Sequence, residues 1–313
     1  MSGPSDDRER ASGAGEASPF VHATVMLRET LDALDPKSGG FYADATIGGG
    51  GHAEGILERS APDGRLFGVD RDPSALMAAR ERLARFGDRV TLVHGAFSDL
   101  ERLLNEHARP RIDGVVADLG VSSPQLDRAE RGFSFRTTGP LDMRMDPTRG
   151  PSARDLIHET SERELADLIY QLGEERKSRP IARSIKRADE ANELETTDDL
   201  RRAVVRAVGP QRRGGIDPAT RTFQALRIAV NRELAELDAL LEQLPSVLED
   251  DGVAVVISFH SLEDRKVKRF FRGEPTLAPL TKRPLIADDA EQATNPRSRS
   301  AKLRAARRVP RAA

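Results

Sequence analysis

The sequence contains no cysteine among its 313 residues. This absence excludes disulfide bonds and metal sites built from thiolates. It also excludes catalysis through a cysteine nucleophile and iron–sulfur clusters held by cysteine. Any catalytic chemistry of the chain must therefore use other side chains.

Long apolar runs are absent as well. The chain has no stretch of 18 apolar residues and no charged segment followed by an apolar one that would mark an export signal. The sequence therefore predicts no membrane contact and a cytoplasmic location. Hydrophobic residues make up 38% of the chain, which is enough for one large or two moderate globular domains.

The chain also lacks a large net charge of either sign, because its formal net charge is only −2. The field of the whole molecule thus does not indicate a partner of opposite charge. Basic residues nevertheless gather in three clusters, at residues 176–187, 201–213 and 297–311. Such clusters occur on RNA-binding surfaces and on ordinary solvated faces, so both interpretations stay open.

Strands and helices alternate along the first part of the chain. Residues 1–19 are rich in Ser, Gly, Asp and Ala and are expected to form a disordered tail. Strands are expected at residues 40–47, 65–70, 90–94 and 112–118, with helices between them. Asp72 and Pro73 form a helix-start signal, and Ser98 with Glu101 forms another. This alternation predicts an α/β fold with a doubly wound parallel sheet, which binds ligands at the carboxyl ends of its strands.

The alternation then stops. Residues 122–150 are loop-like, and residues 152–208 carry only helical signals, including a capping box from Ser161 to Glu164. Residues 125–217 are therefore expected to form an inserted all-helical domain. Residues 20–124 and 218–313 are then expected to form the sheet core.

The second part of the core is expected to open with a helix. Asp217 and Pro218 resemble an N-cap and a first helical residue. One face of the helix is apolar and is expected to pack on the sheet; it carries Phe223, Leu226, Val230, Leu234, Leu237 and Leu241. A strand at residues 253–259, a helix capped by Ser261 and Asp264, and an edge strand at residues 300–309 are expected to follow.

A glycine-rich turn leaves the first expected strand. It reads Asp44-Ala45-Thr46-Ile47-Gly48-Gly49-Gly50-Gly51, and Asp70 ends the next strand. Glycines allow a sharp turn and a close approach to a ligand, and an acid at the position of Asp70 can bind both hydroxyls of a ribose. This pairing predicts a site for a nucleotide cofactor.

Two cofactors fit such a site. Residues 48–53 match the glycine fingerprint of dinucleotide-binding proteins, so a nicotinamide oxidoreductase is one alternative. Asp44 favours S-adenosylmethionine, because an acid just before the loop suits a ligand with an ammonium group. Residues 44–50 also fit the methyltransferase pattern D-x-G-x-G-x-G, with Thr46 in place of the first glycine. With that cofactor and no cysteine, direct methyl transfer to a heteroatom is the expected chemistry.

Asp118 is the candidate catalytic residue. Residues 118–125 leave the fourth expected strand at the switch point of the sheet, where ligands gather. A carboxylate there can hold an exocyclic amine, whose lone pair is delocalised into its ring, in line with a methyl group in a dry site. The alternative is that Asp118 only caps a turn.

Several long and distinct motifs are spread along the chain. They occupy residues 22–27, 44–52, 68–73, 118–127, 130–135, 139–147, 218–228 and 258–265. Together they resemble the bacterial 16S ribosomal RNA cytosine-N4 methyltransferases, the MraW or RsmH family, from about Phe20 to the C-terminus. The resemblance implies a Rossmann-like class I methyltransferase sheet, S-adenosylmethionine as cofactor, and direct methylation of a decoding-centre cytidine on its N4 amine. It also implies 16S ribosomal RNA, in the small ribosomal subunit, as the partner.

The resemblance assigns site residues too. It implies cofactor contacts at Gly50, Gly51, His52, Asp70, Phe97, Asp118 and Gln125, to which the loop pattern adds Asp44. The chain departs from the family at Asp217, where histidine is usual, and in a short segment after Phe271. Neither departure touches a cofactor position, although the second could change RNA contacts.

Other chemistries remain as alternatives. His52, His94 and His260 could join Asp118 in a metal site, but scattered histidines are more often capping or packing groups, so no metal is expected. The aromatic residues Phe133, Phe135 and Phe259 are as easily core residues as platforms for RNA bases. A noncatalytic RNA-binding protein is the remaining class.

Overall fold

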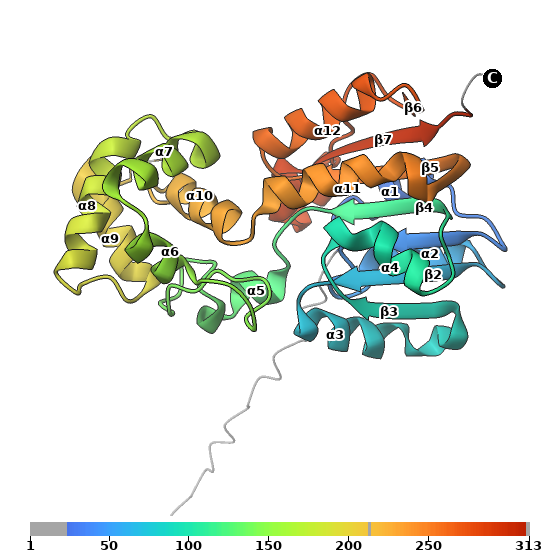
Figure 1. Cartoon of the computed structure of the whole chain (residues 1–313), viewed down its shortest axis with the longest axis horizontal. Helices are drawn as coiled ribbons and strands as arrows, with labels where there is room; N and C mark the ends of the chain where they lie inside the picture. Colours follow the sequence, from blue (N-terminus) through green and yellow to red (C-terminus); the bar gives the residue numbers. More distant parts are fainter. Residues whose placement is uncertain (1–23, 212–213, 311–313) are drawn as a thin grey trace, which may run out of the picture.

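The computed structural model describes residues 24–211 and 214–310 (Figure 1). The predicted tail at residues 1–19 and the start of the motif at residues 22–27 lie outside the described residues. Within them, no helix combines the length and the apolar character that a membrane crossing needs.

A seven-stranded sheet forms the centre of the core. Its strands are β1 (Phe41–Asp44), β2 (Arg65–Asp70), β3 (Val90–His94), β4 (Ile112–Asp118), β5 (Leu248–Ser258), β6 (Leu277–Pro279) and β7 (Lys302–Arg308). They lie in the order β3-β2-β1-β4-β5-β7-β6. Neighbouring strands from β3 to β5 pair in parallel, and β7 pairs antiparallel with both β5 and β6. The predicted doubly wound α/β sheet is confirmed, and its switch point lies between β1 and β4.

Helices cover both faces of this sheet (Figure 1). Apolar residues of α1 (Leu27–Leu34), α2 (Gly51–Arg59) and α3 (Pro73–Leu83) form one buried cluster with one face of the strands. Residues of α4 (Leu100–Glu106), α11 (Glu233–Val247) and α12 (Ser261–Gly273) form a second cluster with the other face. Val116 belongs to the first cluster and its neighbours Val115 and Ala117 to the second, as the alternation of side chains along a strand requires.

Five further helices form a separate unit beside the sheet (Figure 1). They are α6 (Ala153–Glu159), α7 (Glu162–Gly173), α8 (Ser178–Glu190), α9 (Thr197–Val208) and α10 (Thr220–Val230). Their apolar residues form a third buried cluster of their own. The predicted capping box of Ser161 and Glu164 is confirmed at the start of α7. The connection from β4 to this unit contains only the short helices α5 (Ser123–Asp127) and η3 (Ala129–Arg131).

One packing prediction is wrong. Phe223 and Leu226 lie in the cluster of the helical unit, whereas Leu237 and Leu241 pack on the sheet. The chain turns between them at Arg232, whose φ of 52° is left-handed, so the expected single helix is two helices. We therefore propose that the helical insertion extends to about Val230 rather than ending at residue 217.

Three helix starts also differ from expectation. Ser98 caps no helix, because Phe97–Asp99 forms the 3-10 helix η2 ahead of α4. Asp217 accepts a hydrogen bond from the Ala219 N–H at 2.9 Å, but α10 begins only at Thr220. In α12 the capping box consists of His260 and Glu263 instead of Ser261 and Asp264.

The last strand is not at the edge of the sheet. β7 lies between β5 and β6, because residues 277–279 return to pair with its outer side. The short helices α13 (Asp289–Thr294) and η4 (Pro296–Ser300) connect β6 to β7. Arg304 of β7 is buried and donates to Asp264 at 2.7 Å, so part of the third basic cluster is structural.

Candidate active site

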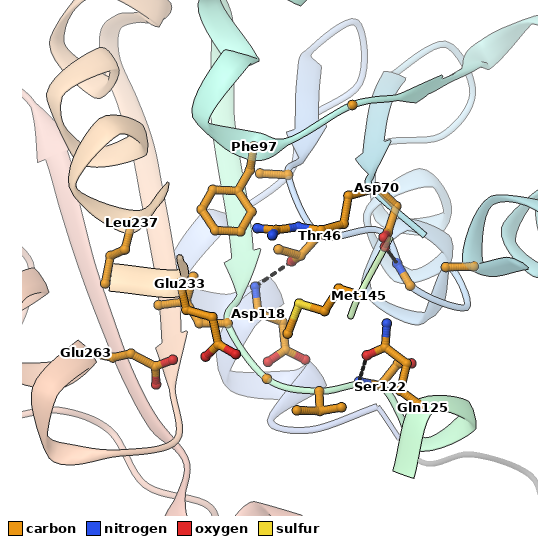
Figure 2. Close-up of a pocket in the computed structure, with 18 residues that line it drawn as sticks. Thr46, Asp70, Phe97, Asp118, Ser122, Gln125, Met145, Glu233, Leu237 and Glu263 are labelled. Atoms are coloured by element: carbon orange, nitrogen blue, oxygen red, sulfur yellow. Dashed lines mark hydrogen bonds between the residues drawn. The ribbon is translucent and has the colours of Figure 1, made fainter. Parts of the chain in front are cut away.

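A cavity lies at the carboxyl ends of the central strands (Figure 2). Ligands of doubly wound sheets bind at this edge. The predicted residues Asp70, Phe97, Asp118 and Gln125 all line it. The switch point of the sheet therefore brings four of the predicted site residues together.

Asp70 ends β2 and is held by the glycine turn. Its two carboxylate oxygens accept hydrogen bonds from the backbone N–H groups of Gly48, at 2.9 Å, and Asp72, at 2.8 Å. Burial raises the pKa of Asp70, and these two hydrogen bonds oppose the increase. A carboxylate oxygen can accept more than one hydrogen bond, so Asp70 retains acceptor capacity for a hydroxyl ligand in the cavity.

Phe97 forms an aromatic wall of the cavity. It lies in η2 directly after β3, and the guanidinium of Arg71 stands 5.4 Å from the centre of its ring. Leu237 of α11 lines the same cavity. Flat apolar side chains of this kind suit a heterocyclic base.

Four predicted contacts do not line the cavity. Asp44, Gly50, Gly51 and His52 are all absent from its walls, whereas Gly48 is present. A Cβ atom on Gly51 would lie 1.9 Å from Thr24 Oγ1, and one on Gly50 would lie 3.3 Å from Leu83. These two glycines therefore permit close packing within the protein, and their contacts with the cofactor stay predictions.

His52 and Asp44 are buried beneath the turn. His52 Nε2 lies 3.0 Å from the carbonyl oxygen of Val25, and burial lowers the pKa of its ring. Asp44 accepts a hydrogen bond from the Thr46 N–H at 3.1 Å. Burial raises the pKa of Asp44 to about 7, and repulsion from Asp118 and Asp70 adds to the increase. The cofactor contacts of Asp44 and His52 also stay predictions.

Asp118 has an oxygen without a partner. Its backbone N–H donates to Thr46 Oγ1 at 2.7 Å, but its buried Oδ1 forms no hydrogen bond within the described chain (Figure 2). Burial raises the pKa of Asp118, while His52 and Arg297 lower it. Buried polar atoms in folded proteins nearly always have a partner, so this acceptor on the cavity wall is available to a donor from a ligand or a water molecule.

Two acids that the sequence interpretation missed lie at the same end of the cavity. Glu233, at the start of α11, and Glu263, in the first turn of α12, face Asp118 (Figure 2). Glu233 binds the guanidinium of Arg227 with both oxygens, at 2.8 and 2.9 Å. Glu263 accepts a hydrogen bond from the Phe259 N–H at 2.8 Å. Glu263 could have been found from the sequence, because it follows β5 as Asp118 follows β4.

Comparison with known proteins identifies the family. The profile of the MraW methylase family matches residues 19–309. The chain belongs to the MraW methylase family.

Curated relatives agree over most of their length. Ribosomal RNA small subunit methyltransferase H of Sorangium cellulosum is 62% identical over 288 residues, which are 92% of this chain and 91% of that protein. The protein of the same name from Synechococcus elongatus is 50% identical over 297 residues, covering 95% of this chain and 97% of that protein. The predicted family is confirmed, and with it the class I fold. Like other MraW methylases, the chain is an S-adenosylmethionine-dependent methyltransferase.

The acids around the cavity suit the charge of that cofactor. S-adenosylmethionine carries an ammonium and a sulfonium group, and positive charge favours the ionised form of neighbouring carboxylates. Burial is the largest cause that raises the pKa of Asp44, Asp70 and Asp118 in the ligand-free chain. The bound cofactor of a MraW methylase would therefore offset the cost of burying these three acids.

The same surroundings do not fit a metal ion. Ligand atoms of Glu233, His260 and Glu263 lie within 4.8 Å of one another. Arg227 already supplies the positive charge that Glu233 binds, and His260 Nε2 lies 3.1 Å from Glu263 Oε1. His94 contacts the carbonyl oxygen of Arg71 at 3.0 Å and does not join this group. The alternative of a metal site formed by His52, His94, His260 and Asp118 is thus not assembled among the described residues.

Proposed function

We propose that this chain transfers a methyl group from S-adenosylmethionine to the N4 amine of a cytidine in 16S ribosomal RNA. The orphaned Oδ1 of Asp118 carries the proposal, because it is a buried acceptor at the transfer end of a methyltransferase cavity. The curated relatives are named for the RNA of the small ribosomal subunit, which supports 16S ribosomal RNA as the substrate. The N4 position rests on the motif resemblance and on the chemistry of this acceptor.

Asp118 would act by orienting the amine. A hydrogen bond from N4 to Oδ1 holds the nitrogen in line with the methyl group and returns electron density to a lone pair that the ring delocalises. The N–CH₃ bond forms as the S–CH₃ bond breaks, and the bonding pair stays on sulfur. The methylated nitrogen is briefly cationic and loses its proton to Asp118 or to water, so no separate base is needed.

Two alternative methylation targets, carbon C5 of a pyrimidine and a uracil base, fit the site less well. Methylation at C5 of a pyrimidine normally needs a cysteine, and the sequence has none. A uracil presents a carbonyl oxygen where cytosine presents its amine, and a carbonyl cannot donate to Asp118. An enclosed carboxylate therefore favours cytosine over uracil.

The helical unit is the proposed RNA-binding part. On α8 the exposed side chains of Arg179, Arg183 and Arg187 follow one another at four-residue intervals, about 6 Å apart along the helix. Arg179 and Arg187 form no ion pair within the described chain, whereas Arg183 lies 3.3 Å from Glu162. We name these three arginines the α8 stripe. A row of cations with this spacing can follow the phosphates of an RNA strand.

Several other basic residues of the first two clusters are less available. Lys186 donates from Nζ to the carbonyl oxygens of Ile157, at 2.9 Å, and His158, at 3.2 Å. Its ammonium group therefore binds carbonyl oxygens near the C-terminal end of α6. In the second cluster, three arginines have acidic partners: Arg201 pairs with Asp217, Arg202 with Asp198, and Arg206 with Glu193. The assembled small subunit as substrate, and the cytoplasm as location, belong to this same proposal.

The test is nucleoside mass spectrometry of small ribosomal subunits from a strain that lacks this protein. After treatment with the purified protein and labelled S-adenosylmethionine, label is expected in N4-methylcytidine. Asp118→Ala should lower turnover at least about a hundredfold, the scale of one lost transition-state contact. Asp113→Ala, at the opposite end of β4, is the matched control and should stay active. Label in 5-methylcytidine or in a ribose methyl group, or no label in cytidine, would refute the assignment.

A further inference from the structure

Residues 132–146, which we name the roof segment, lie between η3 and the helical unit. Met145 of this segment lines the cavity, and Figure 2 shows its side chain reaching toward Asp118. Only 9% of Met145 is exposed, and it packs with Val121 and Phe133. An apolar side chain thus covers the place where the methyl group is transferred.

Arg131 holds this segment from one side. Its side chain is 11% exposed and its NH1 donates to Asp72 Oδ2 at 2.7 Å. Its NH2 donates to the carbonyl oxygens of Met145, at 2.9 Å, and Arg144, at 3.1 Å. The planar guanidinium of an arginine presents its donors to these three acceptors in a fixed geometry, whereas the ammonium group of a lysine is a compact point charge on a flexible stem.

Asn231 holds the segment from the other side. It is 7% exposed and lies at the turn between α10 and α11. Its Oδ1 accepts from the Met145 N–H at 2.7 Å, and its Nδ2 donates to the Met143 carbonyl at 2.8 Å. Both backbone polar groups of Met145 are therefore bound, the N–H by Asn231 and the carbonyl by Arg131.

The backbone shows the effect of this double attachment. Met143 has a φ of 62°, a left-handed conformation that a residue with a side chain rarely adopts. Such a conformation persists only where the surroundings determine it, and it occurs mostly at functional sites. The same network includes Gln125, whose Nε2 donates to Asp72 Oδ2 at 2.9 Å and whose Oε1 accepts from the Ser122 N–H at 3.0 Å.

We propose that Arg131 and Asn231 are positioning residues that hold Met145 as a closed cover over the bound S-adenosylmethionine. They touch neither the cofactor pocket nor the transferred group directly, because neither lines the cavity. Their effect passes through the backbone of Met145. A fixed apolar cover slows the escape of the cofactor and keeps water from the reacting atoms. The cover serves the proposed methyl transfer, but retention of the cofactor is measurable without any RNA.

The experiment measures how fast labelled S-adenosylmethionine leaves the purified full chain after a chase with unlabelled cofactor. Arg131→Lys keeps a charge for Asp72 and loses the fork that reaches both carbonyls. Met145→Ala removes the cover and leaves every backbone hydrogen bond in place. Arg131→Lys is expected to release the cofactor about tenfold faster, the scale of one lost buried hydrogen bond. Met145→Ala is expected to release it at least as fast, because it removes the apolar cover itself.

The double variant separates positioning from general loosening. If Arg131 acts through Met145, then Arg131→Lys together with Met145→Ala releases the cofactor no faster than Met145→Ala alone. Arg128→Met, an exposed neighbour on the same stretch, is the control and should match the native rate. Asn231→Asp keeps the acceptor for Met145 but loses the donations of Nδ2 to the carbonyl oxygens of Met143 and Arg227, so it should also speed release.

Three results would overturn the proposal. They are a native release rate in Arg131→Lys, a native rate in Met145→Ala, and effects that multiply fully in the double variant. Because no RNA is present, these outcomes are independent of the substrate assignment. A circular-dichroism melt of each variant identifies unfolding, and Met145→Ala keeps the proposal falsifiable where Arg131→Lys does not fold.

Discussion

The buried acids beneath the cavity should reverse the usual pH dependence of an aspartate. Burial raises the pKa of Asp44 to about 7, and it raises the pKa of Asp70 and Asp118 as well. A native state that holds protons more tightly than the unfolded chain loses stability as pH rises. For Asp44 the loss begins near its ordinary pKa of 3.8 and is complete just above pH 7.

Asp44→Asn is therefore expected to stabilise the ligand-free protein at pH 8 and to leave it nearly unchanged at pH 4. The amide keeps an oxygen for the Thr46 N–H and has no charge to bury. The gain at pH 8 should be on the order of 2–4 kcal/mol, because each unit of pKa shift corresponds to about 1.4 kcal/mol. Urea unfolding at pH 4, 6 and 8 measures the difference.

An acid with the opposite shift provides the control. Asp63 is exposed, and hydrogen bonds from Ser38 and Gly39 lower its pKa. Asp63→Asn should bring no gain at pH 8, since the charged form of this carboxylate is the one that the fold stabilises. A gain for Asp44→Asn that is equal at pH 4 and pH 8 would show that Asp44 is ionised in the native protein.

At the scale of elements, the sequence predicts the parallel core well. The bounds expected for β2, β3 and β4 agree with the structure, because these buried strands are apolar runs bounded by clear turn residues. The apolar face from Phe223 to Leu241 was harder to interpret. Its helical period continues through Arg232, and periodicity does not state which of two apolar clusters a face will join.

The residues of the site also fall into two groups, those that the sequence predicts and those that only the tertiary fold reveals. Asp70, Phe97 and Asp118 could be predicted because each follows a parallel strand, and such strand ends meet at one edge. Glu233, Arg131 and Asn231 come from the insertion and its return, so only the tertiary fold brings them to the cavity. Lys186 shows the limit of counting charges, because its ammonium group binds carbonyl oxygens of α6 rather than facing solvent.

The α8 stripe should supply a measurable part of RNA binding. Arg179→Gln, Arg183→Gln and Arg187→Gln together should weaken RNA binding and leave cofactor affinity unchanged. Each phosphate contact contributes about 0.7 to the slope of log K against log salt for a single strand, so the slope should fall by about 2. Fluorescence anisotropy with a labelled fragment of 16S ribosomal RNA at several salt concentrations measures both quantities.

Lys186→Gln is the matched variant on the same helix. It removes one charge from the cluster, but that charge is bound to Ile157, His158 and Asp189. It should lower thermal stability and leave the salt slope of RNA binding as it is. An equal loss of slope in Lys186→Gln and in a single stripe variant would contradict the distinction between structural and free charges.

At the scale of the whole molecule, the ion pair of Arg227 with Glu233 joins the helical unit to a residue that lines the cavity. Arg227 belongs to α10 in the helical unit, and Glu233 begins α11 on the sheet. Their bidentate contact spans the turn at Arg232, and Glu233 itself lines the cavity. The position of the proposed RNA-binding unit is thus tied to the cavity that Glu233 and Asp118 line.

Glu233→Gln is expected to destabilise the protein by on the order of 3 kcal/mol, because it leaves the guanidinium of Arg227 largely buried without its partner. Glu263 also stabilises the charge of Arg227 and limits the loss. The exposed pair of Glu162 and Arg183 is the control, and Glu162→Gln should cost less than about 1 kcal/mol. Replacing both members, with Arg227→Met and Glu233→Leu, should recover part of the stability, since no charge is then left buried alone. Urea unfolding of the four proteins tests the assignment, and a loss in Glu233→Gln no larger than that in Glu162→Gln would show that the pair does not hold the two units together.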